Sequence, residues 1–111
     1  MGDKERETVR ARLEAELAET ITELERLEKK LQVEVEYGLG EGDPSIYERE
    51  MNMALRRRAR RKIKSLQEAL SRFESGIYGV CERCGRDIGA QRLEALPQAR
   101  LCIHCAQQAG R

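Results

Sequence analysis

The sequence predicts a mainly α protein, in which a long antiparallel helical hairpin (coiled coil) precedes a small C-terminal module that holds four cysteines. Apolar residues recur every three or four positions along two long stretches, and a glycine-rich break separates these stretches. All four cysteines follow in two Cys-x-x-Cys pairs. We therefore expect a hairpin over residues 1–75, with its tip at 37–44, and a cysteine module over 76–111.

The composition excludes a broad globular core. The chain has 111 residues, no Trp, 37% charged residues and a net charge of +1. No apolar run approaches the length of a membrane span, and no hydrophobic signal segment precedes the charged start. We expect a cytoplasmic monomer that does not associate with membranes.

The first apolar stripe predicts a single helix. Its mean step of about 3.7 residues is nearer to an eleven-residue repeat than to a heptad, so little supercoiling is expected. The stripe consists of Val9, Leu13, Leu17, Ile21, Leu24, Leu27, Leu31 and Val35.

A second helix is expected from Ser45, which forms a capping box with Glu48, to the neighbourhood of Gly76. Asp43 and Pro44 are an alternative cap and first position of this helix. Folding the chain at the glycine-rich break places residue i near roughly residue 81 minus i, so that the two stripes face each other. The second stripe consists of Tyr47, Met51, Leu55, Ala59, Ile63, Leu66, Leu70 and Phe73.

A basic run is the strongest charge feature of the second helix. In the predicted register it lies near acids of the first helix, so part of it should pair across the hairpin. Its outer members, with Arg57, Arg58 and Arg61 as candidates, should contact an acidic partner surface, and no sequence-specific DNA binding is expected. The run is Arg56, Arg57, Arg58, Arg60, Arg61, Lys62 and Lys64.

The cysteine spacing predicts one structural zinc ion. Two Cys-x-x-Cys turns with seventeen residues between them can form the tetrahedron of thiolates that Zn²⁺ prefers, at about 2.3 Å per Zn–S bond. Gly85 follows Cys84 directly, where such a turn needs a residue that tolerates positive φ. The predicted ligands are Cys81, Cys84, Cys102 and Cys105.

Other interpretations of the cysteines have less support. Disulfides need an oxidising compartment, and a thioredoxin-type motif needs a βαβ unit that the sequence does not indicate. His104 lies between Cys102 and Cys105 and could in principle replace one cysteine as a ligand.

Residues 73–105 resemble the C4-type zinc fingers of the DksA/TraR family, bacterial regulators that bind RNA polymerase. The resemblance includes the cysteine spacing and the intervening Arg-Leu-Glu-Ala-x-Pro. Its residues are Glu74, Gly76, Tyr78, Gly79, Cys81, Cys84, Gly85, Ile88, Gly89, Arg92, Leu93, Glu94, Ala95, Pro97, Leu101, Cys102 and Cys105.

The resemblance implies that RNA polymerase is the partner and that the coiled coil enters its secondary channel, where acidic tip residues modulate initiation without cutting RNA. No catalytic activity is expected. Asp43 and Pro44 match the start of the family's tip motif, but Ile46 replaces its second acid and Glu48 its alanine. Glu41 and Asp43 are the candidate tip acids.

The resemblance also bears on the alarmone ppGpp, because the family's basic positions for this nucleotide fall on Ser65, Leu96 and Ala106. No response to ppGpp is therefore expected. Two other functions stay open: a nucleic-acid-binding zinc protein, and a transcript-cleavage stimulator whose Glu41 and Asp43 hold Mg²⁺ at the polymerase.

Overall fold

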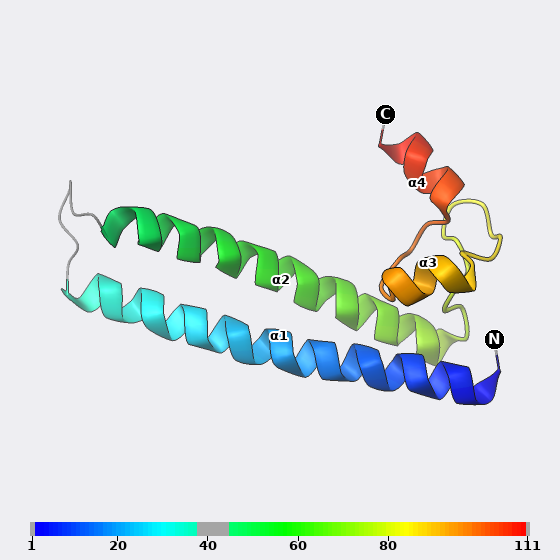
Figure 1. Cartoon of the computed structure of the whole chain (residues 1–111), viewed down its shortest axis with the longest axis horizontal. Coiled ribbons are helices and arrows are strands. Elements are labelled where there is room, and N and C mark those ends of the chain that lie inside the picture. Colours follow the sequence, from blue (N-terminus) through cyan, green and yellow to red (C-terminus); the bar gives the residue numbers. More distant parts are fainter. Residues whose placement is uncertain (1, 38–44, 111) are drawn as a thin grey trace. The chain divides into compact units, whose positions relative to one another are not determined.

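The computed structural model describes residues 2–37 and 45–110, and the mainly helical prediction is confirmed in this part of the chain. The helices are α1 (Asp3–Tyr37), α2 (Ser45–Ser75), α3 (Ala90–Ala95) and α4 (Ile103–Ala109). Figure 1 shows α1 and α2 running side by side in opposite directions, as in the predicted hairpin. No helix among the described residues is apolar enough over a sufficient length to cross a membrane.

The chain divides into two compact units. The first contains Met1–Glu16 and Ser65–Arg111, so that the start of α1 and the end of α2 belong with the cysteine module. The second, Leu17–Lys64, contains the rest of the hairpin. The predicted tip at 37–44 lies outside the described residues apart from Tyr37, which is the last residue of α1.

Helix α2 ends where its glycine predicts. Gly76 has a φ of 75°, in the left-handed region that favours glycine. Its N–H donates to the carbonyl of Phe73 at 3.2 Å, and the N–H of Ile77 donates to the carbonyl of Arg72 at 3.0 Å. These two bonds form a Schellman motif, which satisfies carbonyls at the helix end and turns the chain into the cysteine module.

The buried face of the second unit differs from the predicted stripe. Leu27, Leu31 and Ala59 are buried as expected, but Asn52 is only 6% exposed whereas Met51 is 64% exposed. The predicted stripe advanced by four residues at each step from Tyr47, and each such step rotates the side chain about 40° beyond a full turn. The prediction that Tyr47 and Met51 face α1 is therefore wrong, whereas Leu55, which is 39% exposed, lies beside Leu27 of α1 as expected.

Part of the basic run pairs across the hairpin, as the sequence predicted. Arg60 of the basic run donates to Glu28 at 2.9 Å within the second unit. Other acids of α1 pair along their own helix: Glu23 accepts two hydrogen bonds from Arg26, at 2.7 and 3.1 Å. Glu14 likewise pairs along α1 with Arg10, at 3.3 Å.

Candidate metal centre

The first cysteine pair lies in a tight turn closed by main-chain hydrogen bonds. The N–H of Cys81 donates to the carbonyl of Arg86 at 2.8 Å, and the N–H of Gly85 donates to the carbonyl of Cys81 at 3.0 Å. Gly85 has a φ of 76°, and an isolated antiparallel bridge between Val80 and Asp87 closes the base of the turn. This geometry turns Cys81 and Cys84 to the same side of the chain, as their spacing predicted.

The second pair lies at the start of α4. Cys102 is the N-cap, with extended backbone, and its Sγ accepts a hydrogen bond from the N–H of Cys105 at 3.5 Å. This bond holds the two cysteines on one side of the first helical turn. A sulfur at the N-cap also lies beside unpaired helical N–H groups, which favour its negatively charged form.

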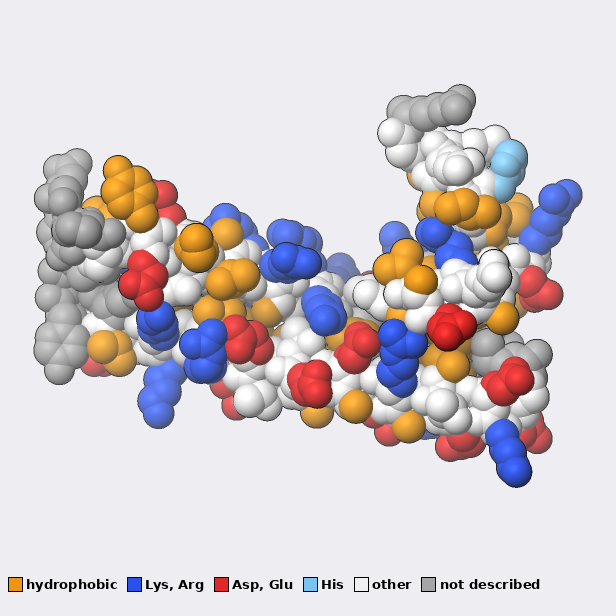
Figure 2. Space-filling model, in the orientation of Figure 1, with side chains coloured by type: hydrophobic (Ala, Val, Ile, Leu, Met, Phe, Trp, Pro, Cys, Tyr) orange, Lys and Arg blue, Asp and Glu red, His pale blue; other side chains and the backbone are white. Residues whose placement is uncertain are grey.

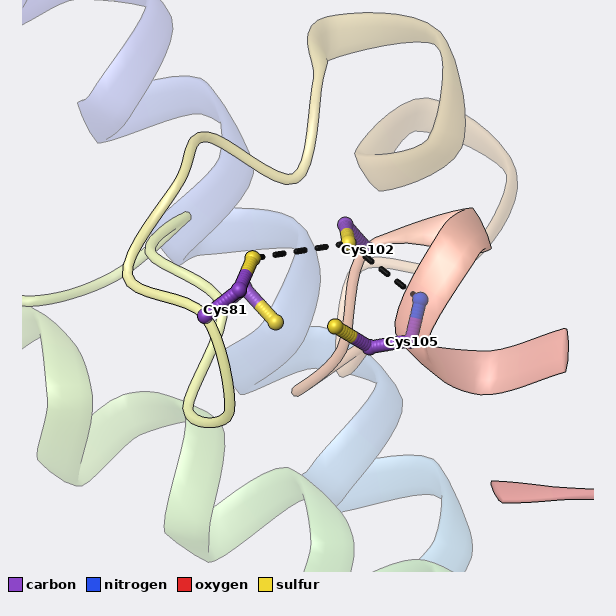
Figure 3. Close-up of side chains that lie close together, drawn as sticks. Cys81, Cys102 and Cys105 are labelled. Carbon is purple, nitrogen blue, oxygen red and sulfur yellow. Dashed lines mark hydrogen bonds between the residues drawn. The ribbon is translucent and has the colours of Figure 1, made fainter. Parts of the chain in front are cut away.

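The two turns bring four sulfur atoms together. The Sγ atoms of Cys81, Cys84, Cys102 and Cys105 all lie within 4.8 Å of one another. Figure 3 shows Cys81, from the loop after α2, turned toward Cys102 and Cys105 at the start of α4. A tetrahedron with Zn–S bonds of about 2.3 Å has sulfur–sulfur edges of about 3.8 Å, and the Sγ atoms of Cys84 and Cys102 are 3.8 Å apart.

These distances and the donor set fit a tetrahedral zinc ion. A disulfide requires about 2.05 Å between sulfurs, and all four cysteines are free thiols. Cys81 and Cys105 are buried, and Cys84 is exposed. Four thiolates would close the coordination sphere and leave no position for substrate, so a zinc ion here would have a structural role.

The thiol pKa values indicate why a cation is needed at this cluster. Hydrogen bonds from the backbone of Cys84 and then of Cys102 lower the pKa of Cys81 to about 6. Burial, followed by the neighbouring sulfurs, raises the pKa of Cys105 to about 12. The protein therefore favours the thiolate form of Cys81 and disfavours that of Cys105. A bound divalent cation would supply the positive charge that allows all four cysteines to ionise.

His104 is not part of the sulfur cluster. Its side chain is exposed, and its Nε2 lies 3.3 Å from Nε2 of Gln108, one turn further along α4. Among the described residues, the four cysteines alone gather at the site. The alternative in which His104 replaces a cysteine therefore has no support from the geometry of the described residues.

Aromatic and polar contacts join the cysteine module to the hairpin base within the first unit. The ring of Tyr78 stacks on Phe73, near the end of α2, with centroids 3.9 Å apart. The Tyr78 hydroxyl donates to the carbonyl of Pro97 at 2.7 Å. Arg12 of α1 donates to the carbonyl of Glu94 at 2.7 Å. These contacts connect both helices of the hairpin to the segment between the two cysteine pairs.

Arg72 is a site residue that the sequence analysis missed. This arginine of α2 is buried, lies 3.6 Å from a carboxylate oxygen of Glu82, and donates to the carbonyl of Gln98 at 3.3 Å. Glu82 follows Cys81 directly, so Arg72 links α2 to both halves of the cysteine module. The position of Arg72 beside Phe73 of the apolar stripe could have indicated that this arginine is buried. The sequence alone does not indicate which groups accept its hydrogen bonds.

Fold and cysteine geometry define a helical protein with a C4 zinc finger. Comparison with known families makes the class specific, since residues 76–109 match the prokaryotic dksA/traR C4-type zinc finger. The resemblance stated from the sequence is thereby confirmed. This protein carries a DksA/TraR-type zinc finger at the end of a helical hairpin.

Particular proteins resemble this chain beyond the finger. The RNA polymerase-binding transcription factor DksA of Escherichia coli strain K12 is 43% identical over 65 residues, which cover 57% of this chain and 43% of that protein. An uncharacterised protein of Aquifex aeolicus is 43% identical over 49 residues. The match thus spans less than half the length of the curated DksA proteins.

A solved structure extends the similarity to the hairpin. Transcription factor DksA2 of Pseudomonas aeruginosa superposes with a TM-score of 0.83 and 26% identity, covering 97% of this chain and 84% of that one. The likeness therefore includes α1 and α2 as well as the finger.

The other predicted site residues are exposed or lie outside the described part. Arg57, Arg58 and Arg61 are exposed on α2, and none of them forms an ion pair among the described residues. The tip acids Glu41 and Asp43 lie outside that part of the chain. Glu48, which stands where the family has alanine, accepts a hydrogen bond from Lys30 at 2.7 Å.

Proposed function

We propose that this protein is a zinc-containing transcription regulator that binds bacterial RNA polymerase in the cytoplasm. The observation that carries the proposal is the likeness to DksA2, because it covers 97% of the chain and so includes the hairpin that would reach the polymerase. The 65-residue match to a protein named RNA polymerase-binding transcription factor supports the same partner. In this proposal the hairpin tip enters the secondary channel and modulates initiation.

The parts of the molecule would have separate roles. Zinc would hold the finger, and contacts such as Tyr78 with Phe73 would hold the finger on the hairpin base. The exposed Arg57, Arg58 and Arg61 would contact an acidic rim of the channel, where charge complementarity raises the rate of association. Glu41 and Asp43 would bring negative charge near the active centre, and no RNA cleavage by the protein is expected.

Binding to purified core polymerase tests the proposal directly. We expect the protein to be retained by polymerase and to be displaced by another secondary-channel factor. The double variant Arg57→Glu/Arg61→Glu should associate more slowly, most clearly at low salt. Lys4→Glu/Lys29→Glu changes the net charge equally at two exposed positions of α1 and serves as the matched control. Absence of polymerase binding by the wild type would contradict the assignment.

A second set of measurements separates the tip from the stem. Asp43→Asn should change transcription from a promoter template with little loss of affinity, because one tip charge adds little contact area. RNA cleavage in a stalled complex that depends on Asp43 would favour a cleavage stimulator instead. DNA or RNA affinity that falls steeply with salt and needs no polymerase would favour a nucleic-acid-binding protein.

A further inference from the structure

The first half of α2 places apolar side chains on its solvent face and polar ones against α1. Tyr47 is 78% exposed, Met51 64% and Leu55 39%, whereas Asn52 is buried. The three apolar residues lie on successive helical turns within an arc of about 80°. Isolated exposed apolar residues are common on protein surfaces, but a row on one face of a helix indicates a contact surface.

This arrangement has a cost in the isolated protein. The side-chain Nδ2 of Asn52 and Nε of Arg56 are buried and have no hydrogen-bond partner among the described residues. Unpaired polar atoms in such positions destabilise a fold, and burying Met51 in their place would stabilise it. Local conflicts of this kind are expected where a surface serves function rather than stability.

The apolar row leads to a hollow between α1 and α2 in the second unit. The hollow has a volume of about 350 Å³, and Leu27, Leu55 and Ala59 form its apolar wall. It exists because the small Ala59 does not fill the space between the helices. Leu55 belongs to both features, so the row and the hollow form one continuous surface, which we call the α2 docking face (Tyr47, Met51, Leu55, Ala59 and Leu27).

Charge around the hollow indicates what it would accept. Arg58 and Lys62 line it and form no ion pair among the described residues, while Glu19 and Glu23 line its other side. Glu23 is already neutralised, because Arg26 donates two hydrogen bonds to it. Figure 2 shows this change along α2, from hydrophobic side chains near its start to Lys and Arg further along. The α2 side of the hollow is therefore basic.

We propose that the α2 docking face binds a segment of RNA polymerase that presents a bulky apolar side chain flanked by carboxylates. The apolar side chain would enter the hollow beside Ala59, and the carboxylates would meet Arg58 and Lys62. This inference rests on the proposed function and assigns its partner contact to residues of α2 outside the predicted tip.

A second copy of this chain fits the α2 docking face poorly. Three side chains on one helical face bury far less than the roughly 1,200 Å² of a stable interface. A copy packed in parallel register would also place Arg58 and Lys62 against their own equivalents, and like charges across an interface are repulsive. The complementary occupant is an acidic surface of a different protein.

Affinity for core polymerase measured with Tyr47→Gln/Met51→Gln tests the inference. Glutamine is a good helix former, and both positions are exposed, so the melting temperature should stay within about 2 °C of wild type. Loss of two apolar anchors should weaken binding about tenfold or more. Val33→Gln, at an exposed apolar position of α1, is the matched control for the single variant Met51→Gln. Val33→Gln should bind polymerase as the wild type does.

A charge variant and a crosslinker locate the contact. Arg58→Glu/Lys62→Glu should slow association at low salt. A photoreactive residue at position 51 should crosslink to a polymerase subunit more efficiently than one at position 33. Wild-type affinity of Tyr47→Gln/Met51→Gln would overturn this inference while leaving the proposed function intact. Failure of the wild type to bind polymerase would overturn both, and a dimer that dissociates in Tyr47→Gln/Met51→Gln would make a second copy the occupant.

Discussion

Asn52→Leu should stabilise the protein, because it places an apolar side chain where the structure buries an amide. Leucine has the same branching as asparagine, so it should fit without overpacking the space between α1 and α2. Removing the buried Nδ2, which has no hydrogen-bond partner among the described residues, contributes about 1 kcal/mol, and burying leucine contributes about 1.5–3 kcal/mol. Since the unfolded chain also buries some apolar surface, we expect a net gain of about 2 kcal/mol.

The gain should be visible in thermal and urea unfolding followed by circular dichroism at 222 nm. A difference of about 2 kcal/mol corresponds to a rise in melting temperature of roughly 8 °C for a domain of this size. Met51→Leu is the matched control, because Met51 is the neighbour of Asn52 and is exposed. This substitution should change the free energy of unfolding by less than about 0.5 kcal/mol. Sedimentation measurements should show that both variants keep the oligomeric state of the wild type.

The opposite pattern would refute the reasoning. If Met51→Leu stabilises the protein and Asn52→Leu destabilises it, α2 is rotated so that Met51 faces α1, as the apolar spacing alone suggested. The basis for the α2 docking face would then be lost as well. Equal zinc content in both variants would show that the finger is unaffected and that the difference arises in the second unit.

Three further predictions concern the finger and the partner. The purified, reduced protein should contain one zinc ion per chain, and Cys84→Ser should lower zinc affinity and loosen the finger while far-UV circular dichroism keeps most of its helical signal; zinc-free protein with an unchanged finger would contradict this. Tyr78→Phe should destabilise the first unit by about 1–2 kcal/mol in urea unfolding, because the buried carbonyl of Pro97 loses its donor, and an unchanged midpoint would exclude that role. In transcription assays with a polymerase that lacks other ppGpp sites, ppGpp should add no effect that depends on this protein; a protein-dependent response would show that other cations, such as Lys62, replace the missing ones.

The metal site was predictable because its chemistry is local and strict. Four cysteines in two Cys-x-x-Cys pairs, with a glycine after Cys84, leave few ways to arrange the sulfurs. The end of α2 was equally clear, since Gly76 offers the left-handed conformation that a helix end uses. Each of these features depends on residues within a few positions of one another.

The first half of α2 could not be predicted from apolar spacing. Apolar spacing predicts that apolar side chains face the partner helix, but Met51 is exposed and Asn52 is buried. The basic run was predictable only in outline, because its spacing indicates that part of it pairs with α1 but does not indicate which residue does so. Only Arg60 among the described members of the run forms an ion pair with α1.

Two arginines of the hairpin bind main-chain oxygens of the finger. Arg12 and Arg72 of the hairpin donate to the carbonyls of Glu94 and Gln98, and within the finger Tyr78 donates to the carbonyl of Pro97. A carbonyl is present whatever side chain its residue carries, so the loop can change its side chains by mutation and keep the attachment. Alanine scanning of residues 94 and 98 should therefore reveal little, and pairwise covariation should be weak there. Evolution should therefore conserve the backbone conformation of this segment more strictly than its side chains. An inserted or deleted residue there should be far more damaging than a substitution at residue 94 or 98.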